Sequence, residues 1–409
     1  MTSPNSQLVL PRIAMYCDYF PPDDVSGAGI QAHNLISELR KIGHKVTVVA
    51  WSSLGDYQRE EQDGVSVYRI PEFVSESTSR IGILVHWLRL FRLFFHLRRE
   101  FDVLHTHGVT LESSFTAVIG RLLGKPVIVK STLSGELSVK NNLGIRIRGI
   151  FLRNVDVFVA LSKDIVKEYE RQSAMMNSSL VLVPNGVDTI RFRPVNQRKK
   201  NELRESLGLP HGPILIYHGV FMERKSIDWL ITSLEDFFIE KRLTLVLLGD
   251  PCRDEADTGY YKKLLCQVER FIADGSIIIR GFSNDVHRYL QASDGYVLPS
   301  TGEGLSNALL EAMSVGLIPI VSRASGSKDL VKDRYNGMTF KSRDTAELHE
   351  AVSWYLSIAG TSKEQLIKEA ARKTIDDGYS IAEIASRYST MYIQMTGGKK
   401  EIGPAETAN

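Results

Sequence analysis

Two glutamates at a fixed spacing, Glu303 and Glu311, are the residues of this chain with the clearest chemical potential. The apolar segment 294–298 before them ends at a proline, which predicts a buried strand. Ser306 is expected to cap an Ala/Leu-rich helix that stops at Gly316. Glu303 then lies in the loop above the strand, and Glu311 lies about one turn inside the helix. A helix start favours phosphate, and a carboxylate one turn along can accept hydrogen bonds from a ribose diol. The segment therefore predicts a nucleotide-sugar pocket.

A basic pair, Arg224 and Lys225, follows another apolar run at residues 214–218. Such a pair can clamp a diphosphate and stabilise the charge that builds on it as it leaves. The alternative is an ordinary solvated pair of surface residues. Their place after the carboxyl end of a predicted strand favours the diphosphate role, most strongly for Lys225.

Histidines at alternate positions, His105 and His107, share one face of a predicted strand and raise the question of a metal. No third ligand stands at a readable spacing, so ordinary strand-end histidines are the preferred interpretation, with His107 on the acceptor side. Asp254 and Asp257 do not form the D-x-D pair of metal-dependent sugar transferases. We expect no metal and no other cofactor.

The glycine-containing segment 27–32 fits the pattern G-x-G-x-x-A of dinucleotide-binding proteins. A dinucleotide loop follows its strand directly, but here Asp18 to Val25 intervene, and no acid follows at the expected distance, so we reject NAD binding. The plainer interpretation is a glycine-containing loop that opens a helix above the first strand and could approach a phosphate or a sugar with little side-chain hindrance.

Two successive series of apolar, β-branched runs alternate with helical stretches, which predicts two parallel sheets covered on both faces. The fold class is therefore α/β, with two doubly wound Rossmann-like domains facing each other across a cleft. We place an N-terminal acceptor domain at 1–195, a C-terminal donor domain at 196–377, a helix returning to the N-terminal domain at 378–396, and a disordered tail at 397–409. The expected strands are 12–17, 46–50, 65–70, 103–105, 127–130 and 157–160, then 214–218, 244–248, 277–280, 295–298 and 318–321.

Composition narrows the class of protein. The chain has 409 residues and a formal net charge of +2, so nothing global argues for nucleic acid as a partner. The cysteines, Cys17, Cys252 and Cys266, show no paired or metal-ligand spacing, which suits a reducing cytoplasm. We see no secretory signal, and charges interrupt the longest apolar stretch, 81–95, so it is too broken to span a bilayer.

The stretch 80–99 combines apolar and aromatic residues with basic ones, including Arg89 and Arg92. Two interpretations stay open: a helix that rests on an anionic membrane surface, or a helix packed on the first sheet. A second basic cluster favours membrane contact slightly, which would make the protein peripheral on the inner face of the membrane. That cluster consists of Lys140, Arg146, Arg148 and Arg153.

With these residues assembled, the chain resembles the family 4 glycosyltransferases, which are retaining, nucleotide-sugar-dependent enzymes of GT-B fold. The family hallmark, two glutamates separated by seven residues in an E-G-x-x-x-x-x-L-E-A-M pattern, stands here at 303–313, with Gly316 and Pro319 in the expected places. Supporting matches lie at 29–33, 43–46, 102–105, 185–188, 248–250 and 336–337.

The resemblance implies a role for each site residue. Glu311 would bind the donor ribose, and Glu303 would bind hydroxyls of the transferred sugar. The diphosphate would be held by Arg224, Lys225 and the amides around the helix start. The reaction would move a sugar from a nucleoside diphosphate to a hydroxyl of a glycan or lipid-linked acceptor, in cell-surface polysaccharide, lipopolysaccharide or glycolipid synthesis. The other donor-side residues are Gly29, Gly219, Gly281, Gly304, Leu305, Ser306 and Asn307.

Three departures from the family pattern concern mainly the acceptor side. Val220 stands where the family often has Arg, Thr132 lies in a loop that often carries His, and Ala28 replaces the first glycine of a pair. Alternative functions are therefore a nucleotide-binding scaffold without activity, a nucleotide-sugar epimerase, or a phosphorylase. A pyridoxal-phosphate-dependent phosphorylase would need a cofactor lysine, and neither Lys328 nor Lys332 has a convincing context.

Overall fold

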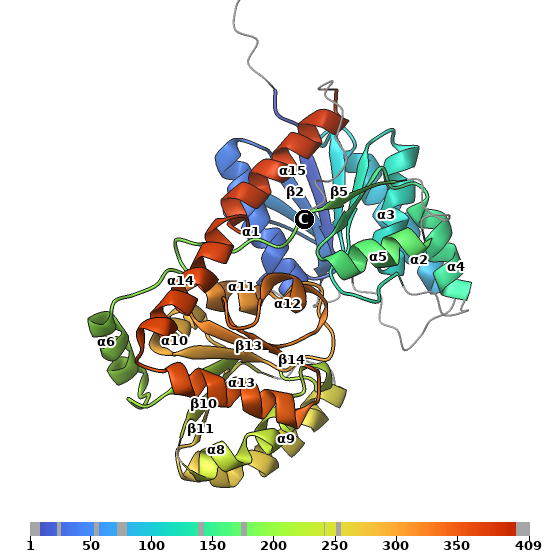
Figure 1. Cartoon of the computed structure of the whole chain (residues 1–409). Helices are drawn as coiled ribbons and strands as arrows, with labels where there is room; N and C mark the ends of the chain where they lie inside the picture. The colour runs from blue at the N-terminus through green and yellow to red at the C-terminus, as the bar shows by residue number, and fades with distance from the viewer. Residues whose placement is uncertain are drawn as a thin grey trace, which may run out of the picture. The chain divides into compact units, whose positions relative to one another are not determined.

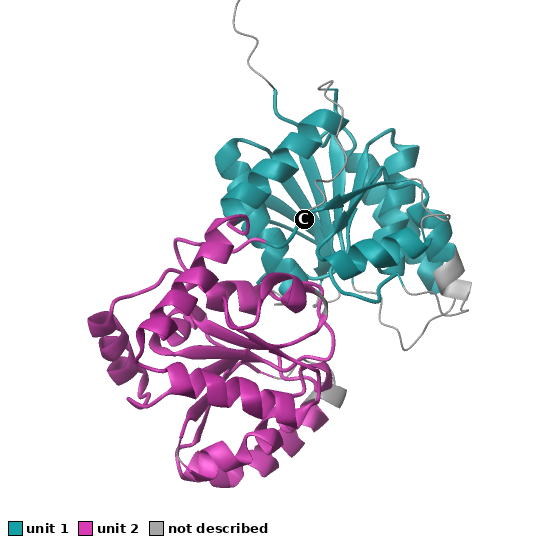
Figure 2. Ribbon diagram, in the orientation of Figure 1, with its two compact units in different colours: residues 1–185, 381–409 teal, residues 186–380 magenta. Residues whose placement is uncertain are grey.

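The protein is described from a computed structural model, which covers residues 9–22, 26–52, 57–71, 80–137, 143–172, 178–240, 242–250 and 255–397. It divides into two compact units (Figure 2). Unit 1 comprises residues 1–185 and 381–409, and unit 2 comprises residues 186–380. The predicted tail lies almost wholly outside the described residues.

The first boundary between the units falls at Asn185–Gly186, earlier than the predicted position at residue 195. The segment after it is bonded to unit 2. The Val187 amide donates to the Tyr379 carbonyl at 2.9 Å, and the Phe192 carbonyl accepts from Arg372 Nη1 at 2.9 Å. The division thus coincides with the turn-forming pair Asn185–Gly186, whereas the charged run 198–200 lies in α6 (Gln197–Leu207), the first helix of unit 2.

Unit 1 is built on an eight-stranded sheet in the order β3-β4-β2-β1-β5-β6-β7-β8. All neighbouring strands pair in parallel except β3, which forms an antiparallel hairpin with β4 through Asp63 and Gly64. The strands are β1 Ile13–Cys17, β2 Val46–Ser52, β3 Gln58–Gln62, β4 Val65–Pro71, β5 Val103–His107, β6 Val127–Lys130, β7 Val157–Ala160 and β8 Ser179–Leu182. The helices of unit 1 are α1 Gly27–Ile42, α2 Arg80–Leu97, α3 Leu111–Leu122, α4 Leu143–Leu152, α5 Lys163–Gln172 and α15 Ile381–Met395.

Helix α15 lies along α1 in unit 1, although residues 186–380, which directly precede it in the chain, form unit 2 (Figure 1). Its apolar side chains join the core between β1, β2 and α1, where Ile384, Tyr388 and Tyr392 are fully buried. Two hydrogen bonds fix the helix further. His44 Nε2 lies 2.7 Å from Ser389 Oγ, and His105 Nδ1 lies 2.7 Å from the Tyr392 hydroxyl. The last helix is therefore an integral part of unit 1.

Unit 2 is built on a parallel six-stranded sheet in the order β11-β10-β9-β12-β13-β14. The strands are β9 Ile214–His218, β10 Thr244–Leu248, β11 Ile277–Arg280, β12 Gly295–Leu298, β13 Ile318–Ser322 and β14 Met338–Phe340. The helices are α6 Gln197–Leu207, α7 Ile227–Ser233, α8 Glu235–Ile239, α9 Glu255–Ala273, α10 Val286–Ala292, α11 Asn307–Ser314, α12 Ser325–Leu330, α13 Thr345–Ile358 and α14 Ser362–Asp376, with a 3₁₀ turn at Glu223–Lys225.

The strand order of unit 2 reverses between β9 and β12. The chain runs outward from β9 to β11, then returns to β12 on the other side of β9 and continues to β14. In open α/β sheets, ligands bind in the crevice outside the carboxyl ends of the strands at such a reversal. The residues that follow β9 and β12 are therefore expected to form the ligand-binding site of this unit.

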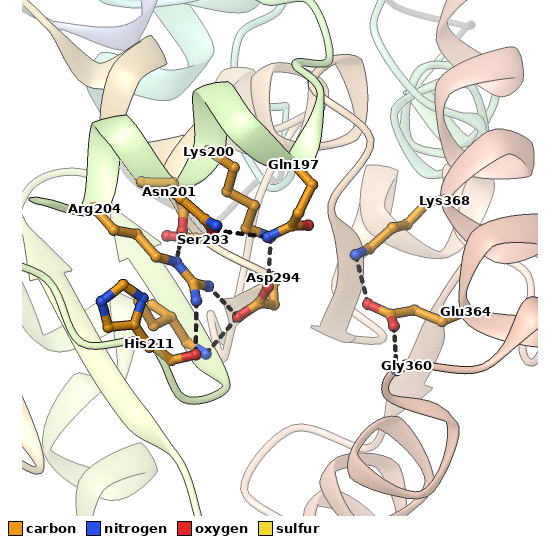
Figure 3. A network of polar contacts seen from close by, with 12 residues as sticks. Gln197, Lys200, Asn201, Arg204, His211, Ser293, Asp294, Gly360, Glu364 and Lys368 are labelled. Atoms are coloured by element: carbon orange, nitrogen blue, oxygen red, sulfur yellow. Dashed lines mark hydrogen bonds and ion pairs between the residues drawn. The ribbon is translucent and has the colours of Figure 1, made fainter.

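The opposite, amino ends of β9 and β12 are held by a partly buried ionic network around Asp294 (Figure 3). Its carboxylate lies 2.5 Å from Lys200 Nζ and 2.6 Å from Arg204 Nη2, and it accepts from the Ile214 amide at 2.8 Å. Burial alone would raise the pKa of Asp294, but Lys200 and Arg204 outweigh it and hold that pKa below its ordinary value. This network anchors α6 to the two strands whose other ends carry the site.

Candidate functional site

The segment after β12 forms the turn and helix start that the sequence predicts. Ser306 has extended backbone angles, and its hydroxyl accepts from the Leu309 amide at 3.3 Å, so it is the N-cap of α11. Leu305 immediately precedes this cap, and Asn307 is the first helical residue. The Gly304 carbonyl accepts from the Gly326 amide at 3.0 Å, which ties the turn to the start of α12. The helix start therefore stands directly above the carboxyl end of β12.

Glu303 is buried in this turn between two cations. Its Oε1 lies 2.5 Å from Lys225 Nζ, its Oε2 lies 3.4 Å from Arg224 Nη1, and its side chain is only 8% exposed. Burial alone would raise the pKa of Glu303, but the attraction of Lys225 and Arg224 outweighs it and lowers the pKa below its usual range. Glu303 is therefore an ionised carboxylate at neutral pH.

The two cations come from the 3₁₀ turn that follows β9. The Thr301 amide donates to the Arg224 carbonyl at 2.9 Å, and the Arg224 guanidinium donates to the Gly302 carbonyl. One backbone and one side-chain hydrogen bond therefore join this turn to the Glu303 loop. The side chain of Lys225 is 14% exposed, which is inconsistent with a solvated surface residue. An ammonium has three donors, so Lys225 can hold Glu303 and an anionic ligand together.

Glu311 is held by a residue that the sequence interpretation did not single out, His218. The Nε2 atom of His218 lies 2.8 Å from Oε2 of Glu311. His218 is the last residue of β9, and Glu311 lies in α11, so the contact bridges the reversal point of the sheet. The sequence feature that could have identified His218 is its position at the carboxyl end of a predicted buried strand, directly before a glycine.

Backbone conformation favours glycine at Gly219, directly after His218, and close packing requires it at Gly249, after β10. Gly219 has φ of 140°, and its carbonyl oxygen would lie 2.0 Å from a Cβ at Gly249, where φ is 146°. The loops after β9 and β10 thus touch backbone to backbone, which only glycine permits. Farther along the sheet edge, Gly281 lies beside the Asp250 carboxylate, 3.3 Å from the position of an added Cβ. Gly219 therefore lies at the reversal point beside His218, whereas Gly281 lies beyond β11.

In unit 1, Gly29 lies in the first turn of α1. Its amide donates to Ser26 Oγ at 3.0 Å, and a Cβ at Gly29 would lie 2.5 Å from the Tyr19 carbonyl oxygen. The glycine is therefore required for close packing against the loop after β1. Whether this turn also approaches a donor phosphate stays a prediction.

His107 ends β5 in unit 1 and is 2% exposed. In the described part of the chain neither of its ring nitrogens has a hydrogen-bond partner, and burial holds the pKa of His107 well below its ordinary value. The imidazole is therefore neutral. Among the residues that the structure describes, no group of three or more His, Cys, Asp or Glu side chains could hold a metal ion.

Comparison with known proteins identifies the class to which these units belong. The family model described as "Glycosyl transferase 4-like domain" matches residues 26–186, and the one described as "Glycosyl transferases group 1" matches residues 199–374. The chain belongs to the family 4 glycosyltransferases. The resemblance inferred from the two-glutamate motif is thereby confirmed, as is the α/β fold with two Rossmann-like domains.

Relatives of this glycosyltransferase include curated bacterial enzymes. It is 25% identical over 353 residues to UDP-Gal:alpha-D-GlcNAc-diphosphoundecaprenol alpha-1,3-galactosyltransferase of Escherichia coli, covering 80% of this chain and 84% of that one. It is also 25% identical over 230 residues to N,N'-diacetylbacillosaminyl-diphospho-undecaprenol alpha-1,3-N-acetylgalactosaminyltransferase of Campylobacter jejuni, covering 55% of this chain and 57% of that one.

Solved structures share the GT-B fold of this glycosyltransferase. The Anabaena protein HepE, in complex with UDP and glucose, superposes with a TM-score of 0.74 at 18% identity, over 93% of this chain and 99% of that one. Sucrose-phosphate synthase from Thermosynechococcus elongatus superposes with a TM-score of 0.77 at 18% identity, over 94% of this chain and 99% of that one.

Proposed function

We propose that unit 2 binds a nucleoside diphosphate sugar at the reversal point between β9 and β12 and transfers the sugar with retention at the anomeric carbon. One observation carries the proposal: Glu303, Lys225 and Arg224 form a compact ionic cluster beside the capped start of α11. In this assignment Glu311 binds the ribose diol and Glu303 the hydroxyls of the sugar. The diphosphate lies between the helix start and the two cations.

The proposed reaction is a substitution on one face of the sugar. The bond between the anomeric carbon and the diphosphate oxygen breaks, and the bond from the acceptor oxygen forms on the same face. The departing phosphate oxygen takes the acceptor proton, and Lys225 and Arg224 stabilise its negative charge. Both carboxylate oxygens of Glu303 lie near these cations, at 2.5 and 3.4 Å. That engagement supports a binding role for Glu303 over a role as covalent nucleophile.

Turnover of the donor tests the proposal as a whole. Purified protein with a series of nucleoside diphosphate sugars and lipid-diphosphate-linked acceptors should form product whose anomeric configuration, read by NMR coupling constants, matches that of the donor. Inverted product would contradict retention. Nucleotide binding without any turnover would favour a scaffold, and nucleotide release from donor and water alone would favour an epimerase.

Replacing Glu311 by alanine should weaken nucleoside diphosphate binding by roughly 10- to 100-fold, because hydrogen bonds to a charged group contribute about 1.5–3 kcal/mol. Isothermal titration calorimetry with UDP, GDP and ADP measures the loss. Glu369→Ala, on the exposed face of α14, is the matched control and should bind as the wild type does. Unchanged affinity of the Glu311→Ala variant would contradict the ribose assignment.

We further propose a lipid-linked acceptor and peripheral contact with an anionic membrane, on the basis of α2. In this proposal the two interpretations of the stretch concern different faces of the helix. Leu90, Leu93 and Phe94 are buried in unit 1, whereas an opposite face exposes apolar residues between arginines. The exposed apolar residues are Leu84, Val85, Leu88 and Phe95, with exposures of 55%, 41%, 53% and 47%, and the exposed arginines are Arg89, Arg92 and Arg99.

Apolar side chains flanked by arginine are suited to the boundary between lipid headgroups and acyl chains. Helix α4, which packs on α3 beside α2, adds the exposed Ile150. Of the second basic cluster, Arg148 is half-buried and donates to the Val109 carbonyl, while Lys140 and the side chain of Arg146 lie outside the described residues. No helix within the described residues has the length and apolarity that a membrane span requires.

Flotation with vesicles tests this contact. Arg89→Gln combined with Arg92→Gln should reduce the fraction of protein that floats with phosphatidylglycerol-containing vesicles, because each basic residue near such a surface contributes about 1 kcal/mol. Neutral phosphatidylcholine vesicles and the pair Arg198→Gln and Lys199→Gln, on α6 of unit 2, are the controls. Equal flotation of all proteins would remove the membrane proposal and leave the assignment of unit 2 intact.

A further inference from the structure

His218 has a polar environment that packing alone does not require. It ends β9, where the preceding residues from Ile214 to Tyr217 are all buried and none carries a charge. Its side chain is 7% exposed, and its ring lies edge-on to Tyr296 with centroids 5.5 Å apart. Only one of its two nitrogens, Nε2, contacts the site, through Glu311 at 2.8 Å.

The hydrogen bond defines what the two ring nitrogens can do. A carboxylate only accepts, so the proton of the contact lies on His218 Nε2. Within the described residues Nδ1 is buried and has no hydrogen-bond partner. The imidazole therefore directs its single engaged N–H at Glu311 and makes no competing bond. An arrangement of this kind orients the carboxylate rather than linking it to a wider network.

Orientation matters because a ribose diol presents two hydroxyl donors in a fixed geometry. A carboxylate offers about four acceptor positions, and a donor on one oxygen fixes the rotation of the group and hence where the others point. Without that donor, Glu311, whose side chain is 17% exposed, would rotate among several positions and lose rotational freedom on binding.

We propose that His218 is a positioning residue for the donor nucleotide: it holds the Glu311 carboxylate in the rotation that accepts both ribose hydroxyls, and thereby sets the preference for ribonucleotides over deoxyribonucleotides. The inference rests on the proposed function, in which Glu311 binds the ribose. A purely structural role, in which the bond only ties β9 to α11, would instead change the affinity for both kinds of nucleotide by the same factor.

Two conservative variants separate these roles, because glutamine and asparagine amides replace different ring nitrogens. In His218→Gln the amide nitrogen lies near the position of Nε2 and can still donate to Glu311. In His218→Asn the amide nitrogen lies near the position of Nδ1, and the shorter side chain does not reach Glu311. Both substitutions place an uncharged amide side chain at this buried position, so a loss of fold would affect the two alike, and thermal melting of each checks it.

The experiment measures the dissociation constants of a ribonucleoside diphosphate and its 2′-deoxy counterpart by calorimetry. The nucleotide is whichever of UDP, GDP and ADP raises the melting temperature of the wild type most. The wild type and His218→Gln should prefer the ribose form on the order of tenfold, the value expected for a hydrogen bond to a charged group. His218→Asn and Glu311→Ala should show a ratio close to one. In turnover, His218→Asn should raise KM for the donor with little change in kcat.

Each other outcome has a distinct meaning. If Glu311→Ala loses the ribose preference and His218→Asn keeps it, the positioning role is overturned and the ribose assignment stands. If His218→Asn weakens the binding of both nucleotides by the same factor, the contact between His218 and Glu311 is structural and the inference is overturned. If Glu311→Ala keeps the full preference, the ribose assignment itself fails, and with it the basis of the inference.

Discussion

Lys225→Met is expected to lower kcat for sugar transfer by about 10²- to 10³-fold, the loss seen when one donor to a developing anion is removed from an active site. Lys225 lies 2.5 Å from Glu303 at the start of α11, where the leaving diphosphate is proposed to lie. Because charge on that diphosphate increases as the bond breaks, the variant should lose more in kcat than in affinity for the nucleotide. Steady-state kinetics and calorimetry on the same preparation measure the two effects.

A structural consequence accompanies the catalytic one. Without Lys225, Arg224 at 3.4 Å is the cation of the cluster that remains beside the buried Glu303 carboxylate. Breaking a buried ion pair by removing one partner costs about 3–5 kcal/mol, so Lys225→Met should also melt at a lower temperature. Lys225→Arg, which keeps the positive charge, should recover most of the stability and part of kcat. Lys262→Met, an exposed position on α9, should change neither.

These variants distinguish electrostatic stabilisation from support of the fold. If Lys225→Arg recovers stability and remains as inactive as Lys225→Met, a specific contact of the ammonium is needed. If Lys225→Met keeps the kcat of the wild type, the assignment of this cluster to the leaving group is wrong.

The sequence predicts the local structure around Glu303 and Glu311 well because its parts are close together in the chain. Glu303, Ser306 and Glu311 stand within one strand, turn and helix, where spacing along the chain determines geometry. Ser306 is the N-cap, as predicted, and β12 ends immediately before the turn. The interpretation of the basic pair as solvated surface residues is wrong for Lys225, because its side chain is 14% exposed and contacts Glu303. The sequence could not show this contact, since only the fold brings residues 225 and 303 together.

His218 escaped prediction for the same reason. Its partner lies 93 residues away, and only the pairing of β9 with β12 brings the two elements together. The polar strand β3, Gln58–Gln62, was not predicted either. Its sequence shows no alternation of apolar and polar residues, and it is recognisable as a strand only by its antiparallel pairing with β4. Short strands such as β14 present too few residues for any periodicity to register.

Helix α2 shows why a single interpretation of an amphipathic stretch can be insufficient. Its apolar residues extend around more than one face, which favoured core packing and membrane contact about equally. Burial shows which face packs into unit 1, since Leu90 is fully buried and Leu88, two positions away, is 53% exposed. The periodicity of a helical sequence shows which side chains share a face of α2. Which of these faces points to the core follows from the packing of α2 on α3.

One buried charge in unit 1 leads to the second large effect. Lys130 ends β6, is 2% exposed, and lies beside His107 in the β5–β6 register, with its ammonium 5.8 Å from the ring centroid of Tyr388. Burial lowers the pKa of Lys130 from 10.5 to about 7. The neighbouring imidazoles of His105 and His107 are also buried, and their pKa values lie well below the ordinary one, so they stay neutral as Lys130 titrates.

Lys130→Met is therefore expected to raise the free energy of unfolding of unit 1, by up to about 4 kcal/mol at pH 7. The folded-state pKa lies below the unfolded one, so the unfolded chain binds the Lys130 proton more tightly, and wild-type stability falls as the pH drops from 10.5 towards 7. Methionine has a similar length and no charge, so it removes this cost. The gain should shrink to roughly 1–2 kcal/mol at pH 9.5, where folded Lys130 is neutral and the unfolded lysine is mostly charged.

Urea unfolding at pH 7 and pH 9.5 measures both values. Trp229→Phe and Trp354→Phe in the background leave Trp51 and Trp87 as the reporters of unit 1. Lys45→Met, at an exposed position, controls for the loss of a lysine as such and should show no pH-dependent gain. A gain that is equal at both pH values would mean that better packing, rather than the removed charge, stabilises the variant. A variant less stable than the wild type at pH 7 would mean that its surroundings stabilise the Lys130 ammonium. The pKa of Lys130 would then not be lowered by burial.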